Sequence, residues 1–183
     1  TLRLPRLDMY VDVMLKNNCR IASKVLPQSA VLKLAQRSCR DSARTPMQWT
    51  GGPWAGFSET RPWFYLNENY RDVNVEVEER DPDSLLNFYR ELIAFRKAEP
   101  LVMEGEYKEH LRQSPNFYVY SREAGGRRLL VICSFADKDT YFTAPEGFDL
   151  MQGRLVLKNY EMNLVINNCF TARPYELRVY LFE

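Results

Sequence analysis

The sequence is poor in several features that mark common functional classes. It has a single histidine, His110, and its four cysteines form no C-x-x-C pair, so we expect neither a bound metal nor a cofactor. The formal net charge is only +1, which does not indicate nucleic acid or a charged membrane surface as a partner. No apolar run reaches the roughly 18 residues that span a bilayer.

The cysteines and the N-terminal residues bear on where the protein resides. Scattered cysteines without an export signal favour reduced thiols and a cytoplasmic protein, while their even number leaves disulfides open. The first six residues lack the apolar core of a signal peptide. Because the sequence does not begin with methionine, we expect it to be part of a longer protein.

The remaining composition is that of an ordinary globular protein. The chain has 183 residues, 45% of them hydrophobic and 27% charged, which fits one domain or a small domain plus part of another. Apolar residues at helical spacing from Leu7 to Met14 predict a helix that Asn17-Asn18 would end. A second short helix is predicted after Pro27.

A long irregular stretch follows, from Cys39 to about residue 80. Pro46 keeps the preceding residue out of the helical region, and all three tryptophans fall between residues 49 and 63. Aromatic faces stack on pyranose rings and arginines donate to hydroxyls, so this loop could form the wall of a sugar site. Alternatively, its aromatic residues anchor a long loop to a larger body. Loops of this length belong to functional sites or need outside support.

Regular structure returns with a helix predicted at about residues 82–99. Asp81 is a suitable N-cap, Pro82 fits the first helical position, and Pro100 ends the helix. One apolar stripe runs along it, formed by Leu85, Leu86, Tyr89, Leu92, Ile93 and Arg96.

After Pro100 the hydrophobic period changes from 3.6 to 2. Gly125-Gly126 separates two strand-like runs and predicts a hairpin. His110 falls in a further predicted strand, and in the last strand Leu177, Val179 and Leu181 share one face. Six or more short strands predict an antiparallel β-sandwich. The clearest strands are predicted at residues 117–122, 128–135, 140–143, 154–158 and 176–182.

Several motifs, taken together, resemble a known family. The segment Arg40–Trp49 closely resembles a signature of glycoside hydrolase family 13, within the group of oligo-1,6-glucosidases, α-glucosidases and trehalose-6-phosphate hydrolases. Thr50 stands where that group usually has an acidic residue, and Ser42 where it usually has asparagine. Further matching motifs follow in the family's order: Ala55-Gly56-Phe57, Pro62-Trp63, Asn74-Val75-Glu76, Asp81-Pro82-Asp83-Ser84, Phe95-Arg96-Lys97, Asn159-Tyr160 and Arg173–Tyr180.

The resemblance implies an α+β arrangement. Residues 1–99 would be the C-terminal remnant of a catalytic (β/α)8 barrel, and residues 100–183 the β-sandwich known as domain C. Loops that follow barrel strands build the active site, which explains a long loop that needs outside support. The helix face formed by Leu86, Tyr89 and Ile93 would then be exposed or covered by residues 7–35.

The resemblance also assigns the site residues. Family members hydrolyse glycosides with retention, using a carboxylate nucleophile and a carboxylic acid/base, and a third carboxylate helps to bind the sugar. In the family all three lie upstream of the segment seen here, so we expect no catalytic residue in this chain. Arg44 corresponds to an arginine that reaches the innermost sugar subsite. Four neighbours are expected to hold the loop, namely Arg40, Asp41 (in a structural salt bridge), Gln48 and Trp49.

Three functional hypotheses remain. The first is the C-terminal fragment of a retaining α-glucosidase that is inactive alone; its parent would act on short α-glucosides of the maltose, isomaltose or trehalose-6-phosphate type. The second is a non-catalytic, carbohydrate-contacting or stabilising module of a split enzyme, with the missing barrel segment as partner. The third is a small active hydrolase with a rearranged site, which needs a pair of carboxylates that the sequence does not nominate.

Overall fold

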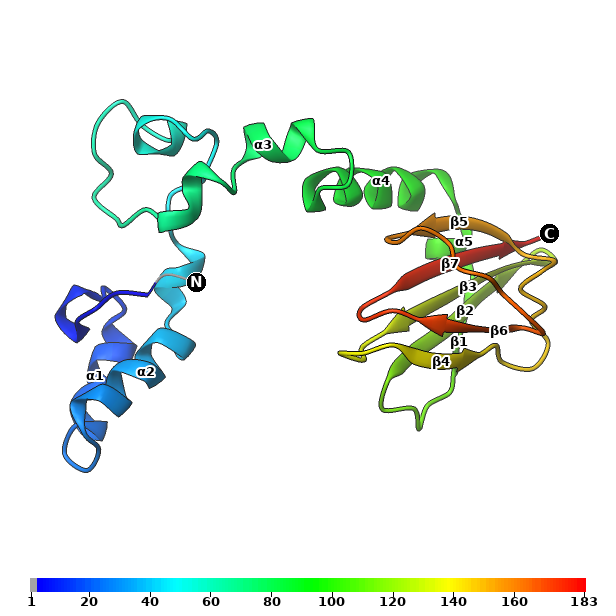
Figure 1. Ribbon diagram of the computed structural model, residues 1–183, viewed down its shortest axis with the longest axis horizontal. Helices are drawn as coiled ribbons and strands as arrows, with labels where there is room; N and C mark the ends of the chain where they lie inside the picture. The colour runs from blue at the N-terminus through cyan, green and yellow to red at the C-terminus, as the bar shows by residue number, and fades with distance from the viewer. Residues whose placement is uncertain (1–2) are drawn as a thin grey trace. The chain divides into compact units, whose positions relative to one another are not determined.

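The computed structural model describes residues 3–183 (Figure 1). These residues form two compact units that divide between Asn87 and Phe88, so the division falls inside helix α4. Within residues 3–183, no helix is both long and apolar enough to cross a membrane. All four cysteines are free thiols, as the sequence favoured.

The first unit contains helices and irregular loop. Its elements are η1 (Leu7–Met9), α1 (Val13–Ala22), α2 (Gln28–Ser38), η2 (Arg40–Ala43), η3 (Pro53–Gly56), η4 (Glu68–Arg71), α3 (Val75–Arg80) and the start of α4 (Leu85–Ala98).

The predicted course of the first helix is wrong. α1 begins after Asp12 and continues through Asn17-Asn18. The carboxylate of Asp12 accepts hydrogen bonds from two backbone N–H groups of the first turn, as an N-cap does. Leu15 and Cys19, one turn apart, are both buried, so packing of this face outweighs the weak helix propensity of asparagine. The predicted helix after Pro27 is confirmed as α2.

The start of α4 also differs from the prediction. Asp81 and Pro82 lie in a turn, and the helix begins at Leu85. The Ser84 hydroxyl accepts the Asn87 N–H at 3.2 Å and donates to the Glu78 carbonyl at 2.6 Å, which fixes the helix entry. The predicted apolar stripe of this helix does not lie on one face. Leu92 packs on the sheet beside Phe88 and Phe95, which the predicted stripe did not include. Three other stripe residues, Leu85, Tyr89 and Ile93, are exposed.

The second unit is the expected antiparallel sandwich. A short helix, α5 (Leu101–Glu104), precedes seven strands. One sheet has five strands in the order β1-β2-β3-β7-β5, and the other pairs β4 with β6. Their bounds are β1 (Glu106–His110), β2 (Phe117–Ala124), β3 (Arg127–Ser134), β4 (Thr140–Thr143), β5 (Arg154–Lys158), β6 (Cys169–Ala172) and β7 (Leu177–Phe182).

The β2–β3 hairpin shows how the sequence sets the register. Gly125 and Gly126 have φ values of +59° and +80°, and their two-residue turn pairs Ala124 with Arg127. Along β3, alternate side chains then reach opposite faces of the sheet. Both faces are buried, which explains why this strand is an unbroken apolar run.

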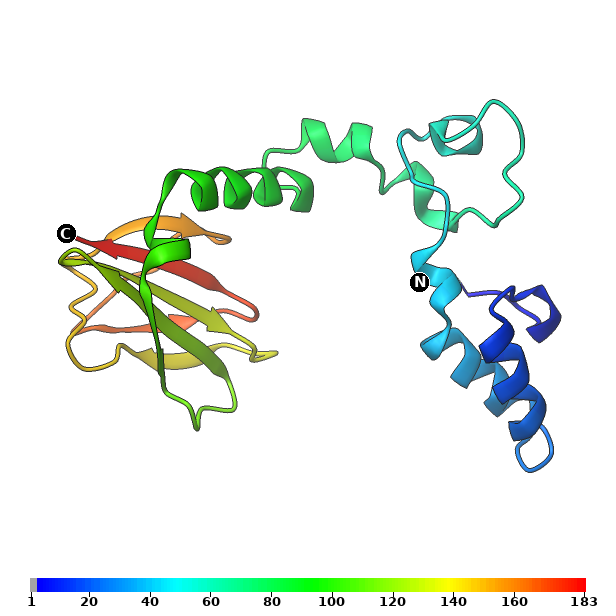
Figure 2. The same cartoon turned by 180° about the vertical axis from the view of Figure 1, so that it is seen from behind.

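Two cores result from this alternation. Between the sheets pack Val119, Leu130, Ile132, Phe142, Phe148, Leu150, Phe170, Ala172, Tyr180 and Phe182. On the other face of the large sheet pack Leu101, Leu129, Val131, Leu157, Val179 and Leu181, together with side chains of α4. Figure 2 shows α5 against this second face, where it contacts β2 and β3.

Two ion pairs hold the sandwich, one of them buried and the other partly exposed. Arg178 and Glu176, each about 1–2% exposed at the side chain, join at 2.7 Å, and the Arg178 guanidinium lies 3.7 Å from the Phe170 ring centroid. Glu99, at the end of α4, accepts two hydrogen bonds from Arg127 of β3 at 2.8 and 3.1 Å. Burial by itself would raise the pKa of Glu99, but the bonds from Arg127 and from the Leu101 N–H outweigh it, so the pKa is lowered overall.

Candidate active-site loop

The second residue of the signature segment, Asp41, is fully buried. Asp41 Oδ2 accepts the backbone N–H groups of Val11 at 2.7 Å and Asp12 at 3.1 Å. Its own N–H donates to the Cys39 sulfur, which starts the short helix η2. Asp41 therefore ties the loop to the N-terminal segment. This is a structural role, as expected, although the tie is to backbone N–H groups as well as to an arginine.

Arg40 makes a second tie to the same segment. Its guanidinium donates to both Asp12 oxygens, at 2.8 and 3.0 Å. These bonds hold the pKa of the Asp12 carboxyl well below its usual range, against the opposing effect of burial. Asp12 thus caps α1 and anchors the signature at once. Asp12 was not predicted from the sequence, although an aspartate directly before a helix is a recognised cap.

The end of the signature supports the helix that follows it. The carbonyls of Gln48 and Trp49 accept the N–H groups of Val75 and Glu76, at 2.9 and 3.0 Å, in the first turn of α3. The Gln48 side chain also donates to the Val73 carbonyl. Arg40, Asp41, Gln48 and Trp49 therefore make the loop-holding contacts expected of them.

A left-handed turn follows the signature. Trp54, Ala55 and Gly56 have φ values of +52°, +58° and +65°, and the Ala55 carbonyl accepts the N–H groups of Trp49 and Thr50. A Cβ on Gly56 would lie 2.8 Å from Thr50 Oγ1, so this position requires glycine. Thr50 Oγ1 also accepts the Gly52 N–H at 3.2 Å. Thr50, a departure from the family pattern, is thus part of the turn.

Arg44 lies beside an open groove of about 370 Å³. Its side chain is 52% exposed, and its guanidinium lies 3.7 Å from Asp41 Oδ1, a buried oxygen without a hydrogen-bond partner. The buried carboxylate can therefore orient Arg44 while leaving its donors available to a ligand. The groove is lined by Arg44, Thr45, Pro46, Phe57, Ser58, Thr60, Arg61, Pro62, Trp63 and Phe64.

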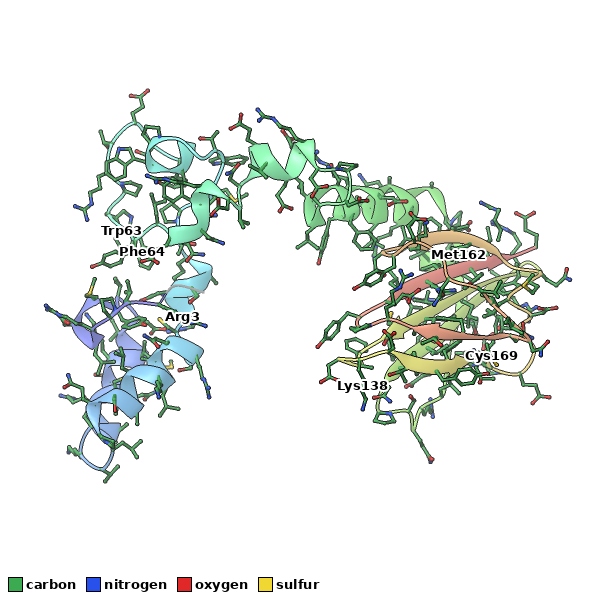
Figure 3. All side chains as sticks on the ribbon, in the orientation of Figure 1. Arg3, Trp63, Phe64, Lys138, Met162 and Cys169 are labelled. Carbon is green, nitrogen blue, oxygen red and sulfur yellow. The ribbon has the colours of Figure 1, made fainter. Side chains whose placement is uncertain are left out.

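Trp63 and Phe64 stand next to each other in this loop (Figure 3). Phe64 is buried in the core of the first unit, whereas Trp63 is 85% exposed and meets the Phe64 ring edge to face at 5.2 Å. Phe64 therefore anchors the loop and Trp63 offers its ring to solvent. Arg61 also lines the groove. Arg61 was not predicted from the sequence, because a lone arginine in an irregular segment gives no periodic signal.

The Arg44 groove lacks histidine and acidic side chains that could act in catalysis. His110 lies in β1, where its Nε2 and the Ser121 hydroxyl are 3.0 Å apart, and partial burial lowers its pKa. Among residues 3–183, no cluster of histidine, cysteine, aspartate or glutamate could hold a metal ion. No aspartate or glutamate is among the residues, all of them described, that line the Arg44 groove.

Comparison with known proteins identifies the family. The family model described as "Alpha amylase, catalytic domain" matches residues 13–105, slightly more than half of the chain. The chain belongs to the α-amylase family, glycoside hydrolase family 13. It is 36% identical over 180 residues to "Probable oligo-1,6-glucosidase 2" of Bacillus subtilis, and 33% identical over 183 residues to an oligo-1,6-glucosidase of Halalkalibacterium halodurans.

The structural comparison agrees with the sequence comparison. A trehalose-6-phosphate hydrolase of Bacillus licheniformis superposes on 99% of the chain with a TM-score of 0.91 and 30% sequence identity. The family 13 fold expected from the sequence is confirmed. The chain spans about one third of its relatives' length: 32% of both oligo-1,6-glucosidases and 33% of the trehalose-6-phosphate hydrolase.

Proposed function

We propose that this chain is the C-terminal part of a retaining α-glucosidase and that it does not hydrolyse glucosides by itself. The observation that carries the proposal is the groove beside Arg44, which offers guanidinium, hydroxyl and aromatic groups but no carboxylate. Retaining hydrolysis needs two carboxyl groups about 5–5.5 Å apart. Asp41 is the carboxylate nearest to Arg44 among the described ion pairs, and it is buried and bound to backbone N–H groups.

In this proposal Arg44 contributes to the site without doing its chemistry. From the family resemblance we expect such an arginine at the innermost sugar subsite, where it would donate to a glucose hydroxyl and orient a carboxylate supplied by the upstream barrel. The buried Asp41 carboxylate orients the Arg44 guanidinium through their ion pair. The nucleophile, the acid/base and the third carboxylate come from outside residues 1–183.

The proposal extends to domain organisation, substrates and location. Residues 1–99 are assigned to the end of the barrel and residues 100–183 to domain C. The relatives' names, oligo-1,6-glucosidase and trehalose-6-phosphate hydrolase, support short α-glucosides as the substrates of the complete enzyme. The four free thiols support a cytoplasmic location.

A chimeric enzyme tests the proposal. The corresponding third of the Halalkalibacterium oligo-1,6-glucosidase is replaced by this chain, and kcat/KM is measured on a nitrophenyl α-glucoside. We expect an active chimera in which Arg44→Ala lowers kcat/KM by about 100-fold, as loss of a charge-assisted contact in the transition state would. Arg37→Ala is the matched control, because Arg37 is exposed on α2 and does not line the groove. A folded chimera whose activity is indifferent to Arg44 would refute the assignment.

A further inference from the structure

The hairpin of α1 and α2 carries charge of one sign. Residues 13–38, here called the basic hairpin, contain five basic residues and no acidic residue, whereas the whole chain has a net charge of only +1. All five are exposed, and none forms an ion pair with a residue in 3–183. They are Lys16, Arg20, Lys24, Lys33 and Arg37. The basic hairpin therefore presents a net charge of +5 to solvent.

The same hairpin exposes apolar side chains. α1 and α2 lie side by side (Figure 1), and the α1 face that packs there contains the buried Leu15 and Cys19. The solvent-facing side of the hairpin mixes its cations with six exposed apolar residues, which are Val13, Met14, Ile21, Val25, Leu26 and Leu34. Such a surface suits a partner that has the opposite charge and apolar groups of its own.

One segment of the same chain has this complementary character. Residues 68–83, here called the acidic segment, run from η4 through α3 to the turn before α4. They contain seven acidic residues and two arginines, so their net charge is −5. Val73 and Val77 of this segment are exposed, with 48% and 43% of their surface accessible. The acidic segment therefore matches the basic hairpin in the size of its charge and opposes it in sign.

The two segments do not pair within one chain. They are held at different ends of the signature, because Arg40 binds Asp12 just before α1, whereas the carbonyls of Gln48 and Trp49 accept N–H groups of the first turn of α3. Among residues 3–183, no ion pair joins the basic hairpin to the acidic segment. Both charged surfaces are therefore left to solvent or to another molecule.

We propose that the basic hairpin of one chain binds the acidic segment of a second copy. Opposite charges steer the two surfaces together, and the exposed apolar side chains of both segments exclude water from the contact. Because each copy carries both segments, two copies related by a two-fold axis form the contact twice. An anionic lipid surface would attract the basic hairpin but would repel the acidic segment of the same unit. The proposal concerns self-association and does not rest on the proposed function.

Analytical ultracentrifugation of the 183-residue chain tests the proposal. We expect a dimer whose dissociation constant rises about tenfold or more between about 0.05 M and about 0.5 M salt, because salt screens exposed charges. One variant reverses three charges of the basic hairpin and is K16E/R20E/K24E. Another reverses three exposed charges of the acidic segment whose side chains make no described contact in residues 3–183, and is E68K/D72K/D83K.

The two charge-reversed variants are measured separately and together. Each alone should be monomeric, because its two surfaces then carry charge of the same sign. An equimolar mixture should form a one-to-one dimer, because each variant then offers the surface that the other lacks. Far-UV circular dichroism establishes that both variants are folded.

The matched control removes the same charge from exposed positions of the second unit and is K97E/K108E/K138E. It should dimerise like the unmodified chain, and an equal loss in this control would overturn the proposal. So would a monomer at every concentration and salt, or a mixture of the two variants that stays monomeric. Association that strengthens with salt would assign the contact to the apolar side chains alone and also overturn it.

A vesicle experiment separates the second copy from a membrane as the partner of the basic hairpin. The chain is sedimented with vesicles of phosphatidylcholine alone and of phosphatidylcholine with phosphatidylserine. We expect neither vesicle to carry it down. A monomeric chain that sediments only with the phosphatidylserine vesicles would overturn the second copy as partner, in favour of an anionic lipid surface.

Discussion

Replacing Asp41 by asparagine removes one buried charge and changes almost no volume. The carboxylate accepts two backbone N–H groups, from Val11 and Asp12, and lies 3.7 Å from Arg44. A hydrogen bond to a charged acceptor contributes about 1.5–3 kcal/mol, compared with about 1 kcal/mol for a neutral one. Over two bonds, we expect Asp41→Asn to lower the free energy of unfolding of the first unit by about 2 kcal/mol.

Tryptophan fluorescence reports the unfolding of this unit, because all three tryptophans lie between residues 49 and 63. Urea unfolding followed by tryptophan fluorescence therefore reports on the first unit alone. Asp8→Asn is the matched control, since the Asp8 carboxylate is 62% exposed and, within residues 3–183, is paired only with Arg6. Hydrogen exchange at the Val11 and Asp12 amides gives a local readout. If Asp41→Asn and Asp8→Asn unfold at the same urea concentration, the anchoring role of Asp41 is refuted.

Three further changes test the fold. Arg178→Ala should destabilise the sandwich by about 3–5 kcal/mol in urea unfolding followed by circular dichroism, because the Glu176 carboxylate keeps its bond from the Arg173 N–H but stays buried without a cation to pair with; a loss below 1 kcal/mol would contradict this. The pKa of Glu99 is lower in the folded than in the unfolded protein, so its contribution to stability is complete above the unfolded pKa and disappears as the pH falls through the folded pKa. Glu99→Gln should therefore make the free energy of unfolding depend less on pH on the acid side; an unchanged dependence would count against this. Gly56→Ala should cost about 1–2 kcal/mol by tryptophan fluorescence, because φ is +65° and the new methyl would meet Thr50; a stable variant would show that the turn adapts.

The sequence predicted those parts of the fold where local pattern and tertiary packing agree. Gly125-Gly126 marked the β2–β3 hairpin, because only glycine takes both positive φ values readily. β6 (Cys169–Ala172) was missed, because this four-residue strand is specified by its pairing with β4. The start of α4 was misplaced, because Asp81 is as good a cap by type as Ser84, whose contacts to Glu78 and Asn87 decide the matter.

The candidate site divides in the same way. Arg44 and its neighbours were predicted from a family signature. The structure adds the reason why the segment holds together, since Asp41 and Arg40 both form hydrogen bonds with the residues just before α1. Arg61 and the exposed face of Trp63 could not be predicted, because their importance depends on which side chains the loop leaves in solvent. No periodic pattern records that choice.

In the function that we propose, this chain carries a substrate-facing arginine of an α-glucosidase but none of the acids that cleave the bond. The most direct test is release of nitrophenol from a nitrophenyl α-glucoside by the purified 183-residue chain, measured beside its Arg44→Ala variant. We expect neither protein to exceed the rate of buffer alone. Turnover by the unmodified chain that Arg44→Ala abolishes would contradict it, because an active site would then exist within these residues.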